Sequence, residues 1–132
     1  MACMSDRTIK VAPAKTGLAR IIAATLNSIS GIKACWHHEA AFRQDLMIGV
    51  VLFILSFFVA RSVEQWLLLT APLLIILIVE LLNSAIEATV DRISLEHHEL
   101  SGRAKDAASA AVMLCWFLIV ASWGAISWFN FS

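Results

Sequence analysis

Residues 75–105 read IILIVELLNSAIEATVDRISLEHHELSGRAK and pass from an apolar run into an acidic segment, with no proline or glycine before Gly102. In a helix, side chains three and four residues apart share one face. One face of this segment is polar and carries Glu80, Asn83, Ser84, Glu87 and Asp91. A carboxylate at bilayer depth costs about 3 kcal/mol or more unless it faces a polar interior or a partner. The pattern therefore predicts a site that uses carboxylates, with a polar clamp between helices as the structural alternative.

The composition indicates an all-α integral membrane protein. Of the 132 residues, 60% are hydrophobic, against about 45–50% in soluble domains. The formal net charge is zero, and no basic patch is interleaved with aromatic residues, so we expect no nucleic-acid partner. The three cysteines, Cys3, Cys35 and Cys115, are too far apart for a disulfide framework or a zinc site and are expected to be free thiols.

One membrane domain is expected over residues 1–132. Residues 1–16 are mixed polar and predict a loose terminus, without the apolar core of a signal peptide. Residues 17–38 have an apolar stripe and predict an amphipathic helix on the membrane surface. Three segments are apolar enough to cross a bilayer: 40–60, 66–93 with a cytoplasmic extension, and 107–129. Ser62 and Gln65 have the spacing of a capping box before the second span.

Basic residues predict the orientation of the chain. They gather before the first span and between the second and third, where Arg92, Arg103 and Lys105 lie. The first connection holds only Arg61, and no basic residue follows the last span. The positive-inside rule then places the N-terminus and the second connection in the cytoplasm. A chain with so few helices is also expected to form a homo-oligomer that encloses its polar groups.

This topology brings three polar segments to the cytoplasmic rim: 37–43, 80–91 and 96–106. Carboxylates beside lysine and arginine suit a phosphorylated substrate that carries Mg²⁺. Glu80 is the deepest carboxylate and the candidate catalytic base, while Glu39 and Glu87 form a candidate metal pair. The string HHE occurs twice, but adjacent histidines on a helix point about 100° apart, which disfavours a zinc site.

Three motifs connect this pattern with a known family: EAAFRQD at 39–45, VELLNSAIEATVDR at 79–92 and HELSGRAKD at 98–106. Together they closely resemble the prokaryotic diacylglycerol kinase family, and the resemblance extends over about residues 17–129. It implies a small homotrimeric enzyme of the bacterial inner membrane, with active sites shared between subunits on the cytoplasmic side. It also implies Mg²⁺-dependent transfer of phosphate from ATP to diacylglycerol, which gives phosphatidic acid.

The resemblance also assigns roles to residues. Glu80 becomes the general base, Glu39 and Glu87 become metal ligands, and Asn83 and Asp91 support the polar face. The implied ATP contacts are Arg20, Asn27, Glu39, Glu87, Glu96, His97, His98, Lys105 and Asp106. The implied lipid and interfacial contacts are Arg20, Lys33, Trp36, Ala41, Phe42, Arg43, Gln44, Asp45, Glu80 and Ser109.

The expected mechanism is direct in-line transfer without a phosphoenzyme. Glu80 accepts the hydroxyl proton of the lipid, and Lys105 offsets the developing charge. Two alternatives remain open at this point. The nearer is a related kinase that acts on undecaprenol, and the more distant is a membrane subunit without enzymatic activity, such as a channel or an assembly scaffold.

Overall fold

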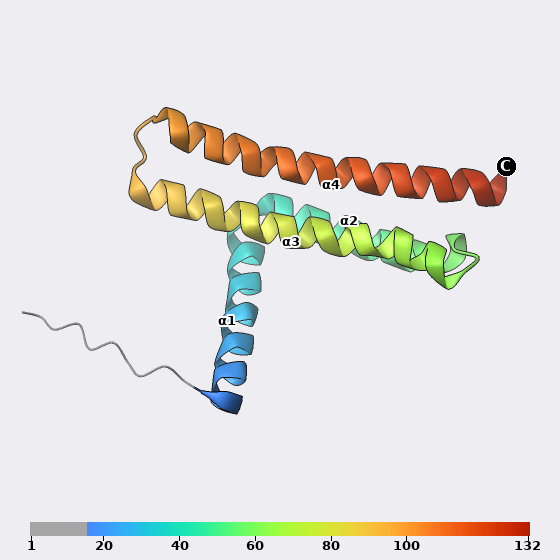
Figure 1. Ribbon diagram of the computed structural model, residues 1–132, viewed down its shortest axis with the longest axis horizontal. Coiled ribbons are helices and arrows are strands. Elements are labelled where there is room, and N and C mark those ends of the chain that lie inside the picture. The colour runs from blue at the N-terminus through green and yellow to red at the C-terminus, as the bar shows by residue number, and fades with distance from the viewer. Residues whose placement is uncertain (1–15) are drawn as a thin grey trace, which may run out of the picture.

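The computed structural model describes residues 16–132, so the loose terminus expected at 1–16 lies almost wholly outside the described residues. The described chain is entirely helical: α1 (Gly17–His38), α2 (Ala40–Val59), α3 (Val63–Ile93) and α4 (Glu99–Phe131). Figure 1 shows α2, α3 and α4 side by side, with α1 projecting sideways from the start of α2. Helix α3 packs against both α2 and α4, which contact each other little. The predicted all-α class is therefore confirmed.

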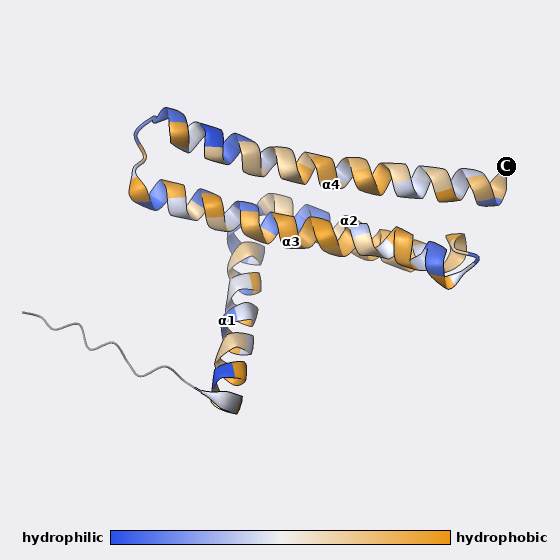
Figure 2. Ribbon diagram, viewed as in Figure 1, coloured by the Kyte–Doolittle hydropathy of each residue, from blue (hydrophilic) through white to orange (hydrophobic). Residues whose placement is uncertain are grey.

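The three packed helices match the prediction of three membrane spans. α2, α3 and α4 are each long and apolar enough to cross a membrane. Figure 2 shows that apolar residues run along the middle of these helices, while hydrophilic residues gather where α3 connects to α4. Many large apolar side chains, such as Phe58, Leu68 and Phe117, point outward from the bundle. Such a surface is suited to lipid and would be unfavourable in water.

Local capping explains where α3 and α4 begin. α3 starts at Val63 rather than at 66, because the Ser62 hydroxyl accepts a hydrogen bond from the Gln65 backbone N–H at 3.3 Å. The Gln65 side chain in turn accepts from the Arg61 backbone N–H at 2.9 Å, which completes a capping arrangement at the predicted spacing. α4 starts at Glu99 rather than at 107, with the His98 ring accepting from the Leu100 N–H at 3.2 Å.

The core lies between α3 and α4, around Ile76 and Ile119. Pro72 stays inside α3, although it removes the N–H that would bond to the carbonyl of Leu68. Beside this weakened turn, the indole N–H of Trp123 on α4 donates to the Leu69 carbonyl at 3.2 Å. This hydrogen bond ties the two helices together at membrane depth, where an unpaired indole N–H would be costly.

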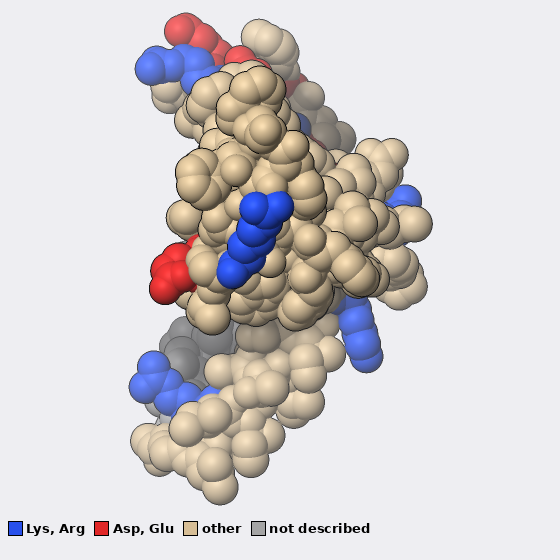
Figure 3. Space-filling view, turned by 90° about the vertical axis from the view of Figure 1, so that its right-hand side faces the viewer, with Lys and Arg blue, Asp and Glu red and all other residues tan. Residues whose placement is uncertain are grey.

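The end of the bundle that contains the α2–α3 turn is closed by Asn130. We call residues 59–65 together with Asn130 the capped end. The Asn130 amide donates to the Val59 carbonyl at 2.8 Å and to the Gln65 side-chain oxygen at 2.9 Å. The Gln65 amide returns a hydrogen bond to the Asn130 oxygen at 3.2 Å. Figure 3 views the molecule from this end, where uncharged atoms cover most of the visible surface of the bundle.

Candidate functional site

The deepest part of the polar face is a pair of buried carboxyl groups. Glu80 on α3 is 5% exposed and Asp45 on α2 is 7% exposed. Their side chains are neighbours, and the Trp116 side chain on α4 lies near Asp45. The three long helices therefore all contribute to this point. Two carboxyl groups buried side by side are positioned to take up and release a proton.

Two further carboxylates lie next to this pair. Glu39 and Glu87 are charged neighbours of Glu80, and both are half-buried. Glu39 is the single residue between α1 and α2, while Glu87 lies two turns beyond Glu80 on α3. Glu87 accepts a hydrogen bond from the Asn83 amide at 3.2 Å. The other side-chain atom of that amide, the oxygen Oδ1 of Asn83, is buried and has no partner within residues 16–132.

The donor set fits a divalent cation that also binds phosphate oxygens. Mg²⁺ is commonly held by one or two carboxylates together with substrate phosphates and water. Glu39 and Glu87 supply two such carboxylates on different elements. Among the residues that the structure describes, no group of three or more His, Cys, Asp or Glu side chains is arranged to hold a metal ion alone.

A cavity of about 380 Å³ lies where α3 connects to α4. Lys105 lies in its wall and pairs with Asp91 across the two helices, with 2.6 Å between the ammonium nitrogen and the carboxylate oxygen. Glu87 is a second charged neighbour of Lys105. Four of the residues that were predicted to contact ATP line this cavity: Glu96, His97, His98 and Lys105. The cation and the first turn of α4 suit a phosphate chain.

A second cavity, of about 590 Å³, separates α1 from α3. Its walls include small residues three apart on each helix: Gly31 and Ala34 on α1, Ala85 and Ala88 on α3. These short side chains leave space between the two helices. Glu39 and the buried Ser84 give the cavity a polar end. It is therefore an apolar space that leads to the carboxylate cluster.

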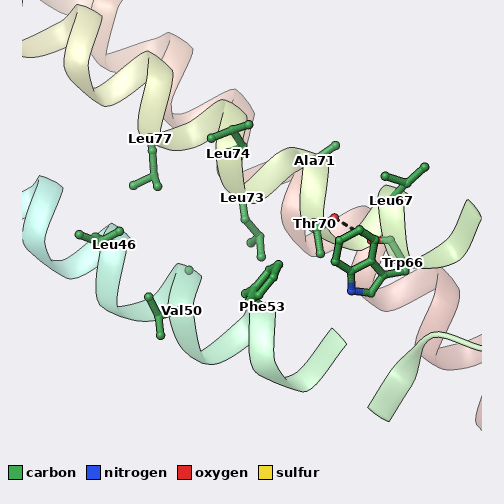
Figure 4. A pocket seen from close by; sticks show the side chains of 11 residues that line it. Leu46, Val50, Phe53, Trp66, Leu67, Thr70, Ala71, Leu73, Leu74 and Leu77 are labelled. Carbon is green, nitrogen blue, oxygen red and sulfur yellow. Dashed lines mark hydrogen bonds between the residues drawn. The ribbon is translucent and has the colours of Figure 1, made fainter. Parts of the chain in front are cut away.

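A third hollow, on the outer side of α2 and α3, has a different character. Figure 4 shows Leu46, Val50 and Phe53 of α2 facing side chains of α3 across it. Its volume is about 510 Å³, and none of its lining residues is charged. The hydroxyl of Thr70 is bonded to the Trp66 carbonyl at 2.9 Å. This groove offers no group for phosphoryl transfer.

The structure does not bring every predicted contact to these cavities. Most of the remaining ones are exposed and line neither the 380 Å³ nor the 590 Å³ cavity: Arg20, Asn27, Lys33, Trp36, Ala41, Gln44, Asp106 and Ser109. Phe42 is buried at 3% exposure, and Arg43 bonds to carbonyls of α1. Trp116, which lies near Asp45, was not predicted as a site residue. Its signal in the sequence is an indole N–H within an apolar span, where it needs an acceptor.

Comparison with known proteins finds relatives over most of the chain. The family model described as prokaryotic diacylglycerol kinase matches residues 26–127. A diacylglycerol kinase of Pseudomonas aeruginosa is 49% identical over 112 residues, which cover 85% of this chain and 91% of the relative. A diacylglycerol kinase of Escherichia coli is 43% identical over 116 residues, covering 88% and 95%. A diacylglycerol kinase of Helicobacter pylori is 36% identical over 121 residues, covering 92% and 93%.

Proposed function

This chain belongs to the prokaryotic diacylglycerol kinase family, and from that premise we propose that it transfers the γ-phosphate of ATP to the free hydroxyl of 1,2-diacylglycerol, giving phosphatidic acid. The observation that carries the proposal is the cluster of Asp45 and Glu80 with their charged neighbours Glu39 and Glu87. Carboxylates from α2, from α3 and from the residue that connects α1 to α2 lie beside an apolar cavity and close to a lysine. A channel lining or a structural clamp needs no such combination.

Glu80 acts as the general base in this proposal. It accepts the proton of the lipid hydroxyl while that oxygen forms a bond to the γ-phosphorus, and the bond from the γ-phosphorus to the bridging oxygen breaks to release ADP. Its burial beside Asp45 supports this role, because the proton stays within a protected pair of carboxyl groups. The unpaired oxygen of Asn83 supplies a free acceptor next to the same face.

The phosphates of ATP interact with both sides of the cluster. Glu39 and Glu87 would hold Mg²⁺ together with phosphate oxygens, and the bound ion neutralises phosphate charge. Lys105 offsets the charge on the transferred group, and its position in the wall of the 380 Å³ cavity supports that role. His97 and His98 contact the nucleotide from the same cavity. The lipid approaches through the 590 Å³ cavity, whose walls are mostly apolar.

The proposed setting is the bacterial inner membrane, with the N-terminus and the carboxylate cluster on the cytoplasmic side. The basic residues of the α3–α4 connection and of α1 support this orientation. α1 lies along the membrane surface, which its sideways projection from the bundle supports (Figure 1). We further propose a homotrimer with shared sites. In one protomer Arg20 and Asn27 lie on α1 and line neither of the two site cavities, so a neighbouring copy would supply them.

The test is a lipid-dependent kinase assay of the purified chain in mixed micelles, with labelled ATP and Mg²⁺. Diacylglycerol and undecaprenol are offered separately. We expect label in phosphatidic acid and little in undecaprenyl phosphate. Preferential labelling of undecaprenol would show that undecaprenol is the substrate instead. ATP consumption that neither lipid stimulates would show that the chain is not a lipid kinase and would favour a membrane subunit without enzymatic activity.

A further inference from the structure

The corner between α1 and α2 is made by one residue, Glu39. α1 ends at His38 and α2 begins at Ala40, and the backbone of Glu39 is extended, with φ −111° and ψ 111°. Its two backbone dihedrals therefore set the direction in which α1 leaves the bundle, which is sideways to the other helices (Figure 1). The side chain of Glu39 provides no cap for α2. Another side chain must therefore fix the angle between α1 and α2.

Arg43, on the first turn of α2, bonds back to the end of α1. One guanidinium nitrogen, Nη1, donates to the Trp36 carbonyl at 2.8 Å and to the His37 carbonyl at 3.3 Å. The last four carbonyls of a helix have no partner within the helix, and a cation there also interacts favourably with the helix dipole. The backbone N–H of Arg43 donates to the Glu39 carbonyl at 3.4 Å. Arg43 therefore bridges both sides of the corner residue.

We propose that Arg43 is a positioning residue that locks the α1–α2 corner and thereby aims the Glu39 carboxylate at the cluster around Glu80. The inference rests on the proposed function, because the proposed function makes Glu39 a ligand of the metal. Without the lock, rotation at Glu39 moves α1 relative to α3. That movement shifts Cys35, which lies on the α1 side of the 590 Å³ cavity. A direct contact of Arg43 with lipid would have a different consequence, because it would change lipid affinity and leave the corner in place.

The first measurement reports the corner itself and needs neither ATP nor metal. Spin labels are placed at exposed positions of α1 and α2, with Ala24→Cys and Val51→Cys, in a chain whose three native cysteines are replaced. Labelled chain is diluted with unlabelled chain in lipid nanodiscs, so that distances within one protomer are recorded. We expect a narrow distribution of distances between the two spin labels in the chain that retains Arg43, and a broad distribution in the Arg43→Gln variant. The control is Arg61→Gln, since Arg61 lies over the Phe131 ring at the capped end, 5.4 Å from its centroid.

The second measurement separates metal from lipid. For Arg43→Gln we expect the half-saturating Mg²⁺ concentration to rise about tenfold, as when the support of a metal ligand is removed, with an unchanged KM for diacylglycerol. Arg43→Lys keeps the charge but lacks the planar fork of donors, so it should be intermediate in both measurements. If Arg43→Gln does not fold, the distance distribution and the Mg²⁺ requirement of Arg43→Lys test the proposal instead.

Two results would overturn the proposal. One is a distance distribution that stays narrow in the Arg43 variants, and the other is a raised KM for diacylglycerol with an unchanged Mg²⁺ requirement. Failure of the proposed function is recognised separately, because the parent chain would then show no kinase activity. In that event the distance distribution alone still decides whether Arg43 locks the corner.

Discussion

The two ends of the helical bundle both bury polar side chains, but these side chains have different partners. At the capped end, the amides of Asn130 and Gln65 bond to each other, and Asn130 also bonds to the backbone of Val59. At the other end, which we call the acidic end, Asp45 and Glu80 are buried together. Within the described residues, each end also has one buried atom without a hydrogen-bond partner: the Asn83 oxygen at the acidic end and the Trp66 indole nitrogen beside the capped end.

This difference between the two ends indicates that one end serves stability and the other serves function. A buried polar group that is fully bonded contributes to stability, whereas one left unpaired costs about 1–3 kcal/mol. Carboxyl groups crowded against each other add a further cost. A protein retains such energetically costly polar groups at sites where they act on a ligand. The hydrogen bonds of Asn130 make the capped end a structural clamp, and we propose the acidic end as the functional site.

The largest expected effect is the loss of turnover in Glu80→Gln. Removing a general base lowers the rate by about 10²–10⁴-fold, and glutamine keeps the size of the side chain without its acid–base function. We expect the kcat for diacylglycerol phosphorylation to fall within this range, with unchanged helicity and ATP binding. Glu64→Gln, at the exposed start of α3, is the matched control. Near-parental phosphatidic acid formation by Glu80→Gln would show that Glu80 is not the base.

The next effect is on stability at the capped end. Asn130→Leu removes two donors and leaves the Val59 carbonyl and the Gln65 side chain without their partner. We expect the free energy of unfolding to fall by about 2 kcal/mol, while kcat per folded molecule stays unchanged. Reversible unfolding in detergent measures the first quantity and the kinase assay the second. Phe129→Leu is the control, since Phe129 is 78% exposed. Lower kcat at equal stability would contradict the division between the two ends.

A third prediction concerns the metal. We expect Glu39→Gln and Glu87→Gln each to raise the half-saturating Mg²⁺ concentration about tenfold or more, because each variant removes one charged ligand. The measurement is a Mg²⁺ titration of kinase activity at saturating ATP. Glu64→Gln again serves as the control and should titrate like the parent. If both site variants also titrate like the parent, the two carboxylates do not hold the metal.

Local patterns in the sequence predicted the helices and the polar face, because each depends on neighbours along one helix. The spacing of Ser62 and Gln65 even predicted the cap of α3. Topology predicted which polar segments share one end of the bundle, but not the individual side-chain neighbours between helices. The pairing of Asp45 with Glu80 joins α2 to α3, and no periodicity within either helix encodes it. α4 begins at Glu99, before the span predicted at 107–129, because hydropathy marks where an apolar span begins and a helix can begin earlier.

The smallest expected effect tests whether Asp91 belongs to the site or only borders it. Its pairing with Lys105 is short, but the two side chains are 49% and 38% exposed, and exposed ion pairs contribute about 0–1 kcal/mol. Asp91→Asn should therefore change the KM for ATP by less than about fivefold. The change should shrink at high ionic strength because salt screens exposed charges. Steady-state kinetics at low and high salt measure it. A loss as large as that of Glu80→Gln would mean that Asp91 acts on the substrate itself, and the acidic end would then extend to the α3–α4 connection.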